Sequence, residues 1–279
     1  MDANDCCVLN NGPGSWAFEG LARQLAGALW IDVSPTPRRY NYLLHADDFD
    51  PASCGDLFIP YSSIRLAADK RLIARAFADH AVPAPETHVF DTLAGAQAHR
   101  RARPDQEWCL KFPTGCGAAG HRMLTDDVRV SSSWPRPLLV QEFVRLEKPE
   151  VYRLYAAGGK LFGWVARRFP EGTRPSPWVA HARGARYEVA GAPPPGAVDT
   201  ARRALEAAGL FDSFGCVDLL QTPKGPWVAL EVGTDGLFNH VDRDVGDADL
   251  AVEIQRRIAE AFWARVGPPP WGAGEWRPR

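Results

Sequence analysis

Lysine and methionine are scarce in this chain of 279 residues, which holds five lysines against 27 arginines and only two methionines. Long apolar runs are also missing: none approaches the roughly 18 to 20 residues that a membrane-spanning helix needs. The first residues are acidic and lack the basic start and apolar core of a signal peptide. We therefore expect a cytoplasmic protein with no membrane partner.

A strong charge of either sign is absent as well. The formal net charge is -2 at pH 7, and no run of four or more lysines and arginines occurs. Proteins that bind nucleic acid or anionic membranes usually carry a basic field or a basic patch. The sequence therefore predicts no nucleic-acid partner.

The six cysteines do not form a metal-binding or disulfide pattern, since no C-x-x-C pair occurs among them. Cys6 and Cys7 are adjacent, and Cys54 stands alone. Cys109 and Cys216 lie inside apolar, strand-like runs, where a small buried thiol is the ordinary role. Neither a disulfide framework nor a zinc site is expected.

The first third of the chain opens with a βαβ-like pattern. Strand, helix, strand and strand patterns follow one another at residues 6–10, 15–29, 30–33 and 40–45. Ser15 is the expected N-cap of the helix. The glycine turn before it could hold an anionic group at the helix N-terminus, or could simply connect strand to helix. A small α/β domain is predicted over residues 1–67.

Mixed helices and strands fill the rest of the chain. Further helices are predicted at 69–80, 92–103, 199–210 and 249–266. Further strands are predicted at 88–90, 107–112, 122–124, 138–144, 151–157, 160–167, 213–220 and 227–232. Residues 170–198, rich in proline and glycine, are expected to be a loop-dominated insert. The predicted units after the first domain are 68–145, 146–267 and a tail at 268–279 that packs as an irregular strap or is mobile.

Two carboxylates face each other in the last predicted hairpin. If this hairpin is symmetric about the bond between residues 224 and 225, Asp218 lies directly opposite Glu231 on one face of the sheet. Like charges at opposite positions destabilise a sheet unless a cation lies beside them. That cation is either a hard ion such as Mg²⁺, which binds carboxylates together with substrate phosphates, or arginine side chains. Geometry alone leaves both interpretations open.

A glycine-rich loop follows a lysine at the end of an apolar strand. Lys111 ends the strand, and Gly115, Gly117 and Gly120 follow it. Small residues let backbone N–H groups approach phosphate oxygens, and the lysine adds a positive charge. The glycines match G-x-G-x-x-G, but a strand pattern follows them instead of the helix that a dinucleotide site requires, and no protein-kinase motif follows. The loop is predicted to cover phosphates, and a plain hairpin loop is the alternative.

Two weaker signals accompany this loop. Lys70 opens a predicted helix, where a lysine opposes the helix dipole unless an anion such as a triphosphate lies nearby. The alternative for Lys70 is an ordinary exposed lysine with no bound anion. The strand-to-loop hinge at residues 141–144 could bind adenine through backbone groups, and Glu150 is a candidate ribose partner a few residues further on.

In their order along the chain, these segments resemble the ATP-grasp superfamily, and most of all its branch of D-alanine–D-alanine ligase and other amino-acid or peptide ligases. The resemblance covers about residues 60 to 245. It is carried by Asp69-Lys70, Val82–Pro85, Leu110-Lys111 with its glycine loop, Val140–Val144, Glu150–Arg153, Gly158–Lys160, Arg167, Gly215–Asp218 and Leu230–Val232. It implies an α/β (α+β) chain in which two α+β subdomains clasp ATP after a small N-terminal domain.

The resemblance also implies a role for each matching residue. Those expected to bind ATP are Lys70, Lys111, Gly115, Gly117, Gly120, Gln141, Glu142, Val144 and Glu150. Arg153 and Arg167 would neutralise the transferred phosphate or an acyl phosphate, and Asp218 and Glu231 would bind Mg²⁺.

One position departs from the family. The family pattern usually reads Glu-x-Asn, but here it reads Glu231-Val232-Gly233, so an oxygen ligand is missing on the face that Glu231 shares with Gly233. Asp235 or Asn239 could replace it. Alternatively, water holds a second Mg²⁺ or the enzyme is impaired.

The activity implied is that of an ADP-forming carboxylate–amine ligase with ATP and Mg²⁺ as cofactors. Its partners would be a small carboxylate and an amine, such as amino acids or a small peptide. An ATP-dependent small-molecule kinase, or a non-catalytic ATP-binding protein with a decayed metal site, are the alternatives. Dimers are frequent among similar ligases, so a homodimer is one expectation.

Overall fold

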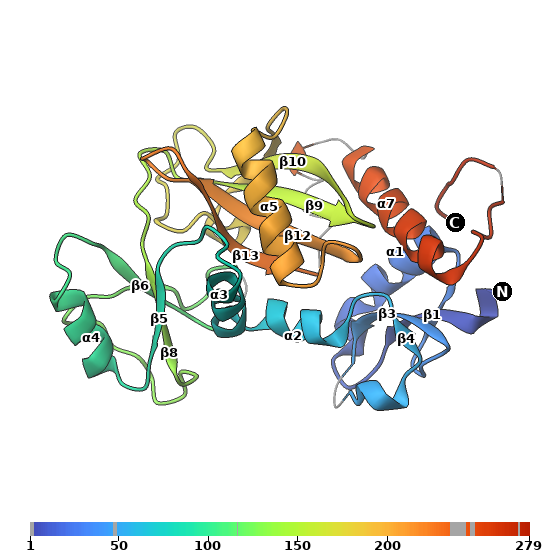
Figure 1. Ribbon diagram of the computed structural model, residues 1–279, viewed down its shortest axis with the longest axis horizontal. Helices are drawn as coiled ribbons and strands as arrows, with labels where there is room; N and C mark the ends of the chain where they lie inside the picture. The colour runs from blue at the N-terminus through green and yellow to red at the C-terminus, as the bar shows by residue number, and fades with distance from the viewer. Residues whose placement is uncertain (1–2, 47–48, 116, 235–243, 246–248, 273) are drawn as a thin grey trace.

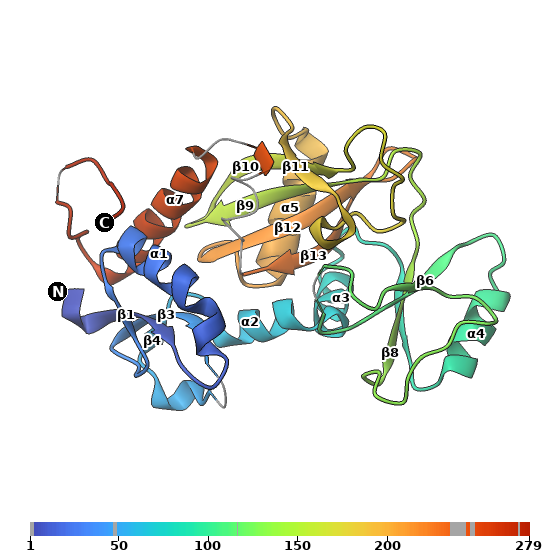
Figure 2. The same ribbon diagram turned by 180° about the vertical axis from the view of Figure 1, so that it is seen from behind.

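The computed structural model describes residues 3–46, 49–115, 117–234, 244–245, 249–272 and 274–279 (Figure 1). Three sheets organise them, with strand orders β2-β1-β3-β4, β5-β8-β6-β7 and β11-β10-β9-β12-β13. Figure 1 shows the first two sheets at opposite ends of the molecule and the five-stranded sheet between them, with α5 across it. Figure 2 shows the opposite side, with β11 next to β10 in the five-stranded sheet.

The α-helices are α1 (Glu19–Leu29), α2 (Tyr61–Ala68), α3 (Lys70–Asp79), α4 (Leu93–Arg101), α5 (Pro195–Ala207) and α7 (Asp249–Val266). The strands of the first two sheets are β1 (Cys6–Asn10), β2 (Asp32–Ser34), β3 (Tyr40–His45), β4 (Asp56–Leu57), β5 (Thr87–Phe90), β6 (Trp108–Lys111), β7 (Arg122–Met123) and β8 (Leu138–Glu142). Those of the five-stranded sheet are β9 (Glu150–Ala157), β10 (Lys160–Arg168), β11 (Arg186–Val189), β12 (Phe214–Gln221) and β13 (Trp227–Gly233).

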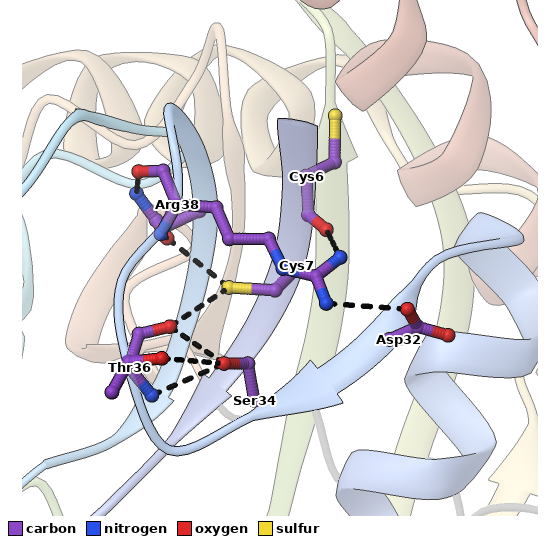
Figure 3. A network of polar contacts seen from close by, with 7 residues as sticks. Cys6, Cys7, Asp32, Ser34, Thr36 and Arg38 are labelled. Atoms are coloured by element: carbon purple, nitrogen blue, oxygen red, sulfur yellow. Dashed lines mark hydrogen bonds and ion pairs between the residues drawn. The ribbon is translucent and has the colours of Figure 1, made fainter. Parts of the chain in front are cut away.

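The N-terminal sheet is parallel, with the fully buried β1 between β2 and β3. A polar network holds the connection between β2 and β3 (Figure 3). Arg38 donates to the carbonyl of Cys6 (2.8 Å) and to Asp32 (3.2 Å). The Cys7 thiol donates to Asn41 Oδ1 at 3.2 Å, and burial raises the pKa of this thiol. The five cysteines in the described part of the chain are free.

The hydrophobic core is divided in a way that leaves room for a cleft. One large core joins the N-terminal sheet to the five-stranded sheet through α1, α5 and α7. The sheet β5-β8-β6-β7 has a small core of its own, which includes Trp108, Leu110, Leu138 and Val140. Because each of these two bodies buries its own apolar side chains, the surfaces that face each other are free to carry polar groups.

Two local expectations were wrong, and a third was incomplete. Ser15 does not cap α1: it is the first residue of a 3₁₀ turn (Ser15–Phe18), and α1 begins at Glu19. The insert at residues 170–198 is loop-dominated, as expected, but it also contains the short strand β11, which gains its hydrogen bonds by pairing with β10. Helix α5 begins at Pro195 rather than Asp199, because a proline in the first turn removes an N–H that would have no helical partner.

The C-terminal tail is the irregular strap that the sequence allowed. The indole N–H of Trp276 donates to the carbonyl of Ala28 at 2.9 Å, and that of Trp30 donates to the carbonyl of Arg277 at 2.7 Å. The Arg279 guanidinium lies 4.1 Å from the Trp30 ring centroid. The tail therefore covers the end of α1. No helix in the described ranges is both long and apolar enough to span a membrane.

We expect Trp276→Ala to lower the free energy of unfolding by about 3 kcal/mol, because it empties a buried site and leaves the Ala28 carbonyl without its donor. Chemical denaturation measures this. Trp16→Ala is the matched control: Trp16 is 78% exposed, so its loss is expected to change stability by less than about 0.5 kcal/mol. Equal effects of the two substitutions would contradict a structural role for the tail.

Candidate active site

A cavity of about 170 Å³ lies between the β5-β8-β6-β7 sheet and the five-stranded sheet. Lys111, the glycine loop and residues 141–146 line it from the first side, and Lys70 lines it from the start of α3. The second side is lined by Arg167, Asp218, Leu230 and Glu231. Residues 177–180 of the insert form a third wall of the cavity. Most of the residues that the sequence assigned to ATP thus meet at one place.

The predicted pairing of the two carboxylates is confirmed: Asp218 on β12 pairs with Glu231 on β13. The hairpin is not symmetric throughout, however. Near the turn, Leu219 pairs with Ala229, and a β-bulge between this pair and the next leaves Leu230 as the extra residue. Continuing the register of the turn would have placed Leu230 opposite Asp218. A bulge often re-aims a side chain beside a functional site, and here it brings Glu231 opposite Asp218.

Asp218 is held by two arginines and is only 2% exposed. Arg153 on β9 binds it with Nε at 2.7 Å and Nη2 at 3.1 Å, and Arg167 on β10 donates to Oδ2 at 2.6 Å. Burial alone would raise the pKa of Asp218, but the two guanidinium charges and their hydrogen bonds outweigh it and hold the pKa well below its ordinary value. The arginine alternative therefore applies to Asp218 in this structure.

Glu231 is placed differently. Its side chain is 39% exposed, and its carboxylate lies 3.5 Å from Lys70 Nζ. In the wall beside it, burial lowers the pKa of Lys111 below its ordinary value, and the charge of Glu231 only partly opposes this. An anion next to Lys111 would favour its protonated form. Glu231 is thus the accessible carboxylate of the pair.

Lys70 and the glycine loop form one unit. Asp69 caps α3 by accepting the N–H of Arg71 at 2.8 Å, which offsets the unfavourable position of Lys70 in the first turn. The Lys70 backbone N–H donates to the carbonyl of Pro113 at 2.9 Å, and its ammonium donates to the carbonyl of Gly115. The loop is therefore tethered to the residue expected to bind phosphate.

The insert packs against the same loop. Arg183 donates to the carbonyl of Ala118 at 3.3 Å. Gly117 has φ = +60°, and a Cβ there would lie 3.2 Å from the Ala182 side chain. Both the backbone conformation and the space at this position favour glycine. The cover over the cavity is thus built by two segments, and sequence reasoning assigned only the glycine loop to it.

The hinge region lines the cavity as predicted, with Gln141, Glu142 and Val144 all in its wall. The backbone N–H of Glu142 donates to the carbonyl of Glu86 at 2.8 Å, and that of Phe143 donates to the carbonyl of Glu107 at 2.7 Å. These two N–H groups are therefore occupied within the protein.

Two of the cavity residues that the sequence prediction missed are aromatic side chains next to the glycine loop and the hinge. His121 follows the glycine loop directly and is 8% exposed; burial, helped by the charge of Lys111, lowers its pKa to about 4. Trp178 comes from the insert, and its ring lies 6.3 Å from the rings of both His121 and Phe143. The position of His121 beside the loop was a usable signal. Trp178 gave none, because only the folding of the insert over the sheet brings it here.

Several predicted residues are not in the cavity wall. Glu150 accepts hydrogen bonds from Tyr152 (2.7 Å) and Arg168 (2.7 Å) outside it, so its ribose contact stays a prediction. Arg153 reaches the site only through Asp218, and Gly120 (φ = +76°) lies at the end of the loop without lining the cavity. Gly233 ends β13 opposite Cys216. Asp235 and Asn239 lie outside the described residues.

The chemistry of these groups fits a magnesium-bound triphosphate. Lys70, Lys111 and Arg167 line the cavity beside Asp218 and Glu231, and Arg153 binds Asp218 from behind, which leaves an excess of positive charge around the carboxylate pair for an anionic ligand. Arg167 Nε is buried and has no hydrogen-bond partner among the described residues. Glu231, with Asp218 behind it, would hold the cation, since carboxylate oxygens are the protein ligands that Mg²⁺ prefers.

This arrangement of two α+β units around a cleft is the ATP-grasp fold, as likeness to solved structures shows. One is the ATP-grasp ligase PsnB complexed with a phosphomimetic variant of its minimal precursor, Mg and ADP: TM-score 0.65, 13% identity, covering 95% of this chain and 99% of that one. A second is a RimK domain ATP-grasp protein from Sphaerobacter thermophilus DSM 20745: TM-score 0.62, 18% identity, covering 92% and 98%.

A third is the D-cycloserine synthetase DcsG: TM-score 0.58, 20% identity, covering 96% of this chain and 86% of that one. In a further PsnB structure, with minimal precursor, Mg and ADP, the match covers 77% of this chain and 63% of that one at a TM-score of 0.56 and 15% identity. No protein-family model and no curated protein matches the chain. At these identities the likeness establishes the fold.

The different surroundings of the two carboxylates predict different effects of neutralising each one. Asp218→Asn is expected to lower the free energy of unfolding by about 3 to 5 kcal/mol, because it leaves two buried guanidinium groups without their counter-ion. Glu231→Gln is the matched control and is expected to cost less than about 1 kcal/mol, since its carboxylate is accessible to water. Urea denaturation of both variants without nucleotide measures the difference; equal losses would contradict this arrangement.

His121 predicts a pH dependence of stability. The unfolded chain takes up a proton at His121 near its ordinary pKa of about 6.5, whereas the folded chain does so only near pH 4. The free energy of unfolding therefore falls as the pH drops from about 6.5 to about 4, by roughly 3 kcal/mol from this residue. His121→Gln lacks this loss. Denaturation of both proteins at pH 7 and pH 4.5 should show a smaller decrease for the variant, and parallel curves would contradict the burial of a neutral imidazole.

Proposed function

We propose that this protein is an ATP-dependent carboxylate–amine ligase that forms an amide or peptide bond through an acyl phosphate, on an amino acid or a small peptide. The main support for this proposal is the set of residues that line the cavity. The cavity places Lys70, Lys111 and Arg167 with an accessible carboxylate under a glycine-rich loop, on a fold whose solved examples include a ligase complexed with Mg and ADP.

The nucleotide would lie along the cavity from the hinge to the carboxylate pair. The hinge at residues 141–144 and the indole of Trp178 offer an apolar slot with backbone polar groups, which suits adenine. Lys70, Lys111 and the glycine loop would bind the phosphates, through charge and through backbone N–H groups. Mg²⁺, when held by the accessible carboxylate of Glu231, would supply charge neutralisation on the transferring phosphoryl group, while Asp218 orients the two arginines behind it.

The reaction needs no protein nucleophile. A carboxylate oxygen of the substrate attacks the γ-phosphorus of ATP, the bond to the β-phosphate oxygen breaks, and ADP leaves. The amine then attacks the acyl carbon, phosphate leaves, and the amine loses a proton to water. Arg167, oriented by Asp218 and flanked by Arg153, would stabilise the negative charge that develops in both steps. Catalysis of this kind depends on positioning and on charge.

The proposed substrate class is supported by the neighbours and by the insert. One similar ligase is complexed with its minimal precursor, and another is a D-cycloserine synthetase. In this chain Trp178 of the insert lies at the proposed adenine slot, whereas Ala182 and Arg183 pack on the glycine loop, so the insert is expected to influence acceptor entry from the side of that loop.

The proposal is tested by measuring ADP release from Mg-ATP with a panel of amino acids, small peptides and small carboxylates, each with and without an amine. We expect release that depends on both a carboxylate and an amine. Glu231→Ala is expected to lower kcat by at least about 100-fold, a loss typical of removing one group that stabilises transition-state charge. Glu188→Ala is the control, because Glu188 is an exposed acid of β11 paired with Arg168 outside the cavity.

Other results of this assay would point to a different function or would contradict the proposed metal site. ADP release that needs a carboxylate or alcohol but no amine would identify a small-molecule kinase. Binding of ATP without any Mg²⁺-dependent turnover would identify a non-catalytic nucleotide-binding protein. Full turnover by Glu231→Ala would contradict the assignment of the metal site.

A further inference from the structure

A second group of potential metal ligands lies on the outer side of the β5-β8-β6-β7 sheet. Glu86 immediately precedes β5, His88 lies on β5, and His99 lies on α4, whose helix packs against that strand. One ligand atom from each of these three residues lies within 4.8 Å of the other two. None of the three lines the nucleotide cavity. Glu86 lines a neighbouring cavity that shares Lys70, Lys111 and Gln141 with the nucleotide cavity, so the group adjoins the site described above without being part of its wall.

The sequence spacing explains how two of these ligands come together. Residues 86 and 88 are two apart in extended chain, so their side chains point to the same side of the sheet. His88 Nε2 lies 2.6 Å from Glu86 Oε1. His99 comes over them from the helix, with its ring centroid 4.4 Å from that of His88. Two imidazoles and one carboxylate thus converge from two different elements.

These groups already hold a cation. The Arg103 guanidinium, just beyond the end of α4, is paired with Glu86 Oε1 through Nη1, and the same nitrogen lies 3.4 Å from His99 Nε2. Its side chain is 41% exposed, so it can swing into water without opening the core. Glu86 and His99 therefore meet at a position where positive charge is favoured and from which arginine can leave.

The floor of this group is rigid and apolar. The Trp108 ring is 1% exposed and lies 4.6 Å from the His99 ring and 5.8 Å from the His88 ring, centroid to centroid. Phe90 packs on His99 from the other side at 5.2 Å. Aromatic packing restricts the rotamers of both imidazoles, and a metal site requires such fixed ligands.

We propose that Glu86, His88 and His99 bind a divalent transition-metal ion, with Zn²⁺ as the best match, in exchange for the Arg103 guanidinium. Two nitrogen ligands and one carboxylate suit Zn²⁺, Co²⁺ or Ni²⁺, whereas Mg²⁺ prefers an all-oxygen set. Ligands at about 2.0 to 2.2 Å from zinc lie roughly 3 to 3.5 Å apart. The present separations therefore require side-chain shifts on the order of 1 Å, and water would complete the coordination.

Such an ion would join α4 to the strand next to the adenine hinge. The carbonyl of Glu86 accepts the N–H of Glu142 at 2.8 Å, and the metal would be bound by the side chain of the same residue. The proposal does not depend on ligase activity, because it concerns binding of a metal by the free protein.

The test is Zn²⁺ titration by calorimetry on the full, untagged chain without nucleotide, with Co²⁺ absorption spectra as an independent readout of ligand type. We expect one ion per chain at this site. Glu86→Gln and His99→Gln should each weaken binding by more than about tenfold. Arg103→Gln should tighten binding several-fold, because it removes the competing cation without removing a ligand. His181→Gln is the control: His181 also lies beside a carboxylate, Asp244, at 3.2 Å, and its loss should leave the affinity unchanged.

The Arg103→Gln variant keeps the proposal falsifiable even if a histidine variant folds poorly, since it predicts a gain of affinity at an exposed position. No Zn²⁺ binding by either the wild type or Arg103→Gln would overturn the proposal. So would unchanged affinity in Glu86→Gln and His99→Gln, a failure of Arg103→Gln to bind more tightly, or a Co²⁺ spectrum with the charge-transfer band of a thiolate ligand.

Discussion

The buried contact between Asp218 and its two arginines is the interaction on which the candidate active site depends. It joins β9, β10 and β12 through side chains that are almost out of contact with water. A buried charge is costly unless it is paired and hydrogen-bonded, so the three residues fix one another's orientation. Arg167 is thereby held at the cavity wall before any substrate arrives, and electrostatic catalysis requires charges oriented in this way.

Around this fixed network, the more adaptable parts of the site come from other segments. Glu231 is accessible and aimed by a β-bulge, Lys70 is tied to the glycine loop, and the insert packs over that loop. The two bodies that meet at the cavity have separate hydrophobic cores. A cleft between separately packed bodies can change its width without disturbing either core, and this property suits a site that must admit a nucleotide and then exclude water.

Much of the site could be read from the sequence, because its signals are local. Apolar runs, glycine turns and helix patterns located α3, the β9–β10 hairpin and α7, and a count across the turn paired Asp218 with Glu231. Near the turn, the two strands pair in a register that differs by one residue from the one assumed in the count. The bulge at Leu230 shifts the pairing by one residue, so Glu231 still lies opposite Asp218. Periodicity could not foresee the bulge, since backbone pairing decides it. Nor could it find β11, whose hydrogen bonds exist only next to β10, or the short helix α2, which has no side-chain cap.

The order of the chemical groups follows from the amino-acid chain alone: a lysine at a helix start, a lysine before a glycine loop, two arginines on a hairpin and two acids on the next one. How these groups divide their tasks depends on the folded arrangement. It buried Asp218 between the arginines and left Glu231 accessible, because three strands enclose the first carboxylate while the second lies at the open cavity. It also brought Trp178 to the nucleotide cavity and His99 to Glu86, contacts between segments that no local pattern connects.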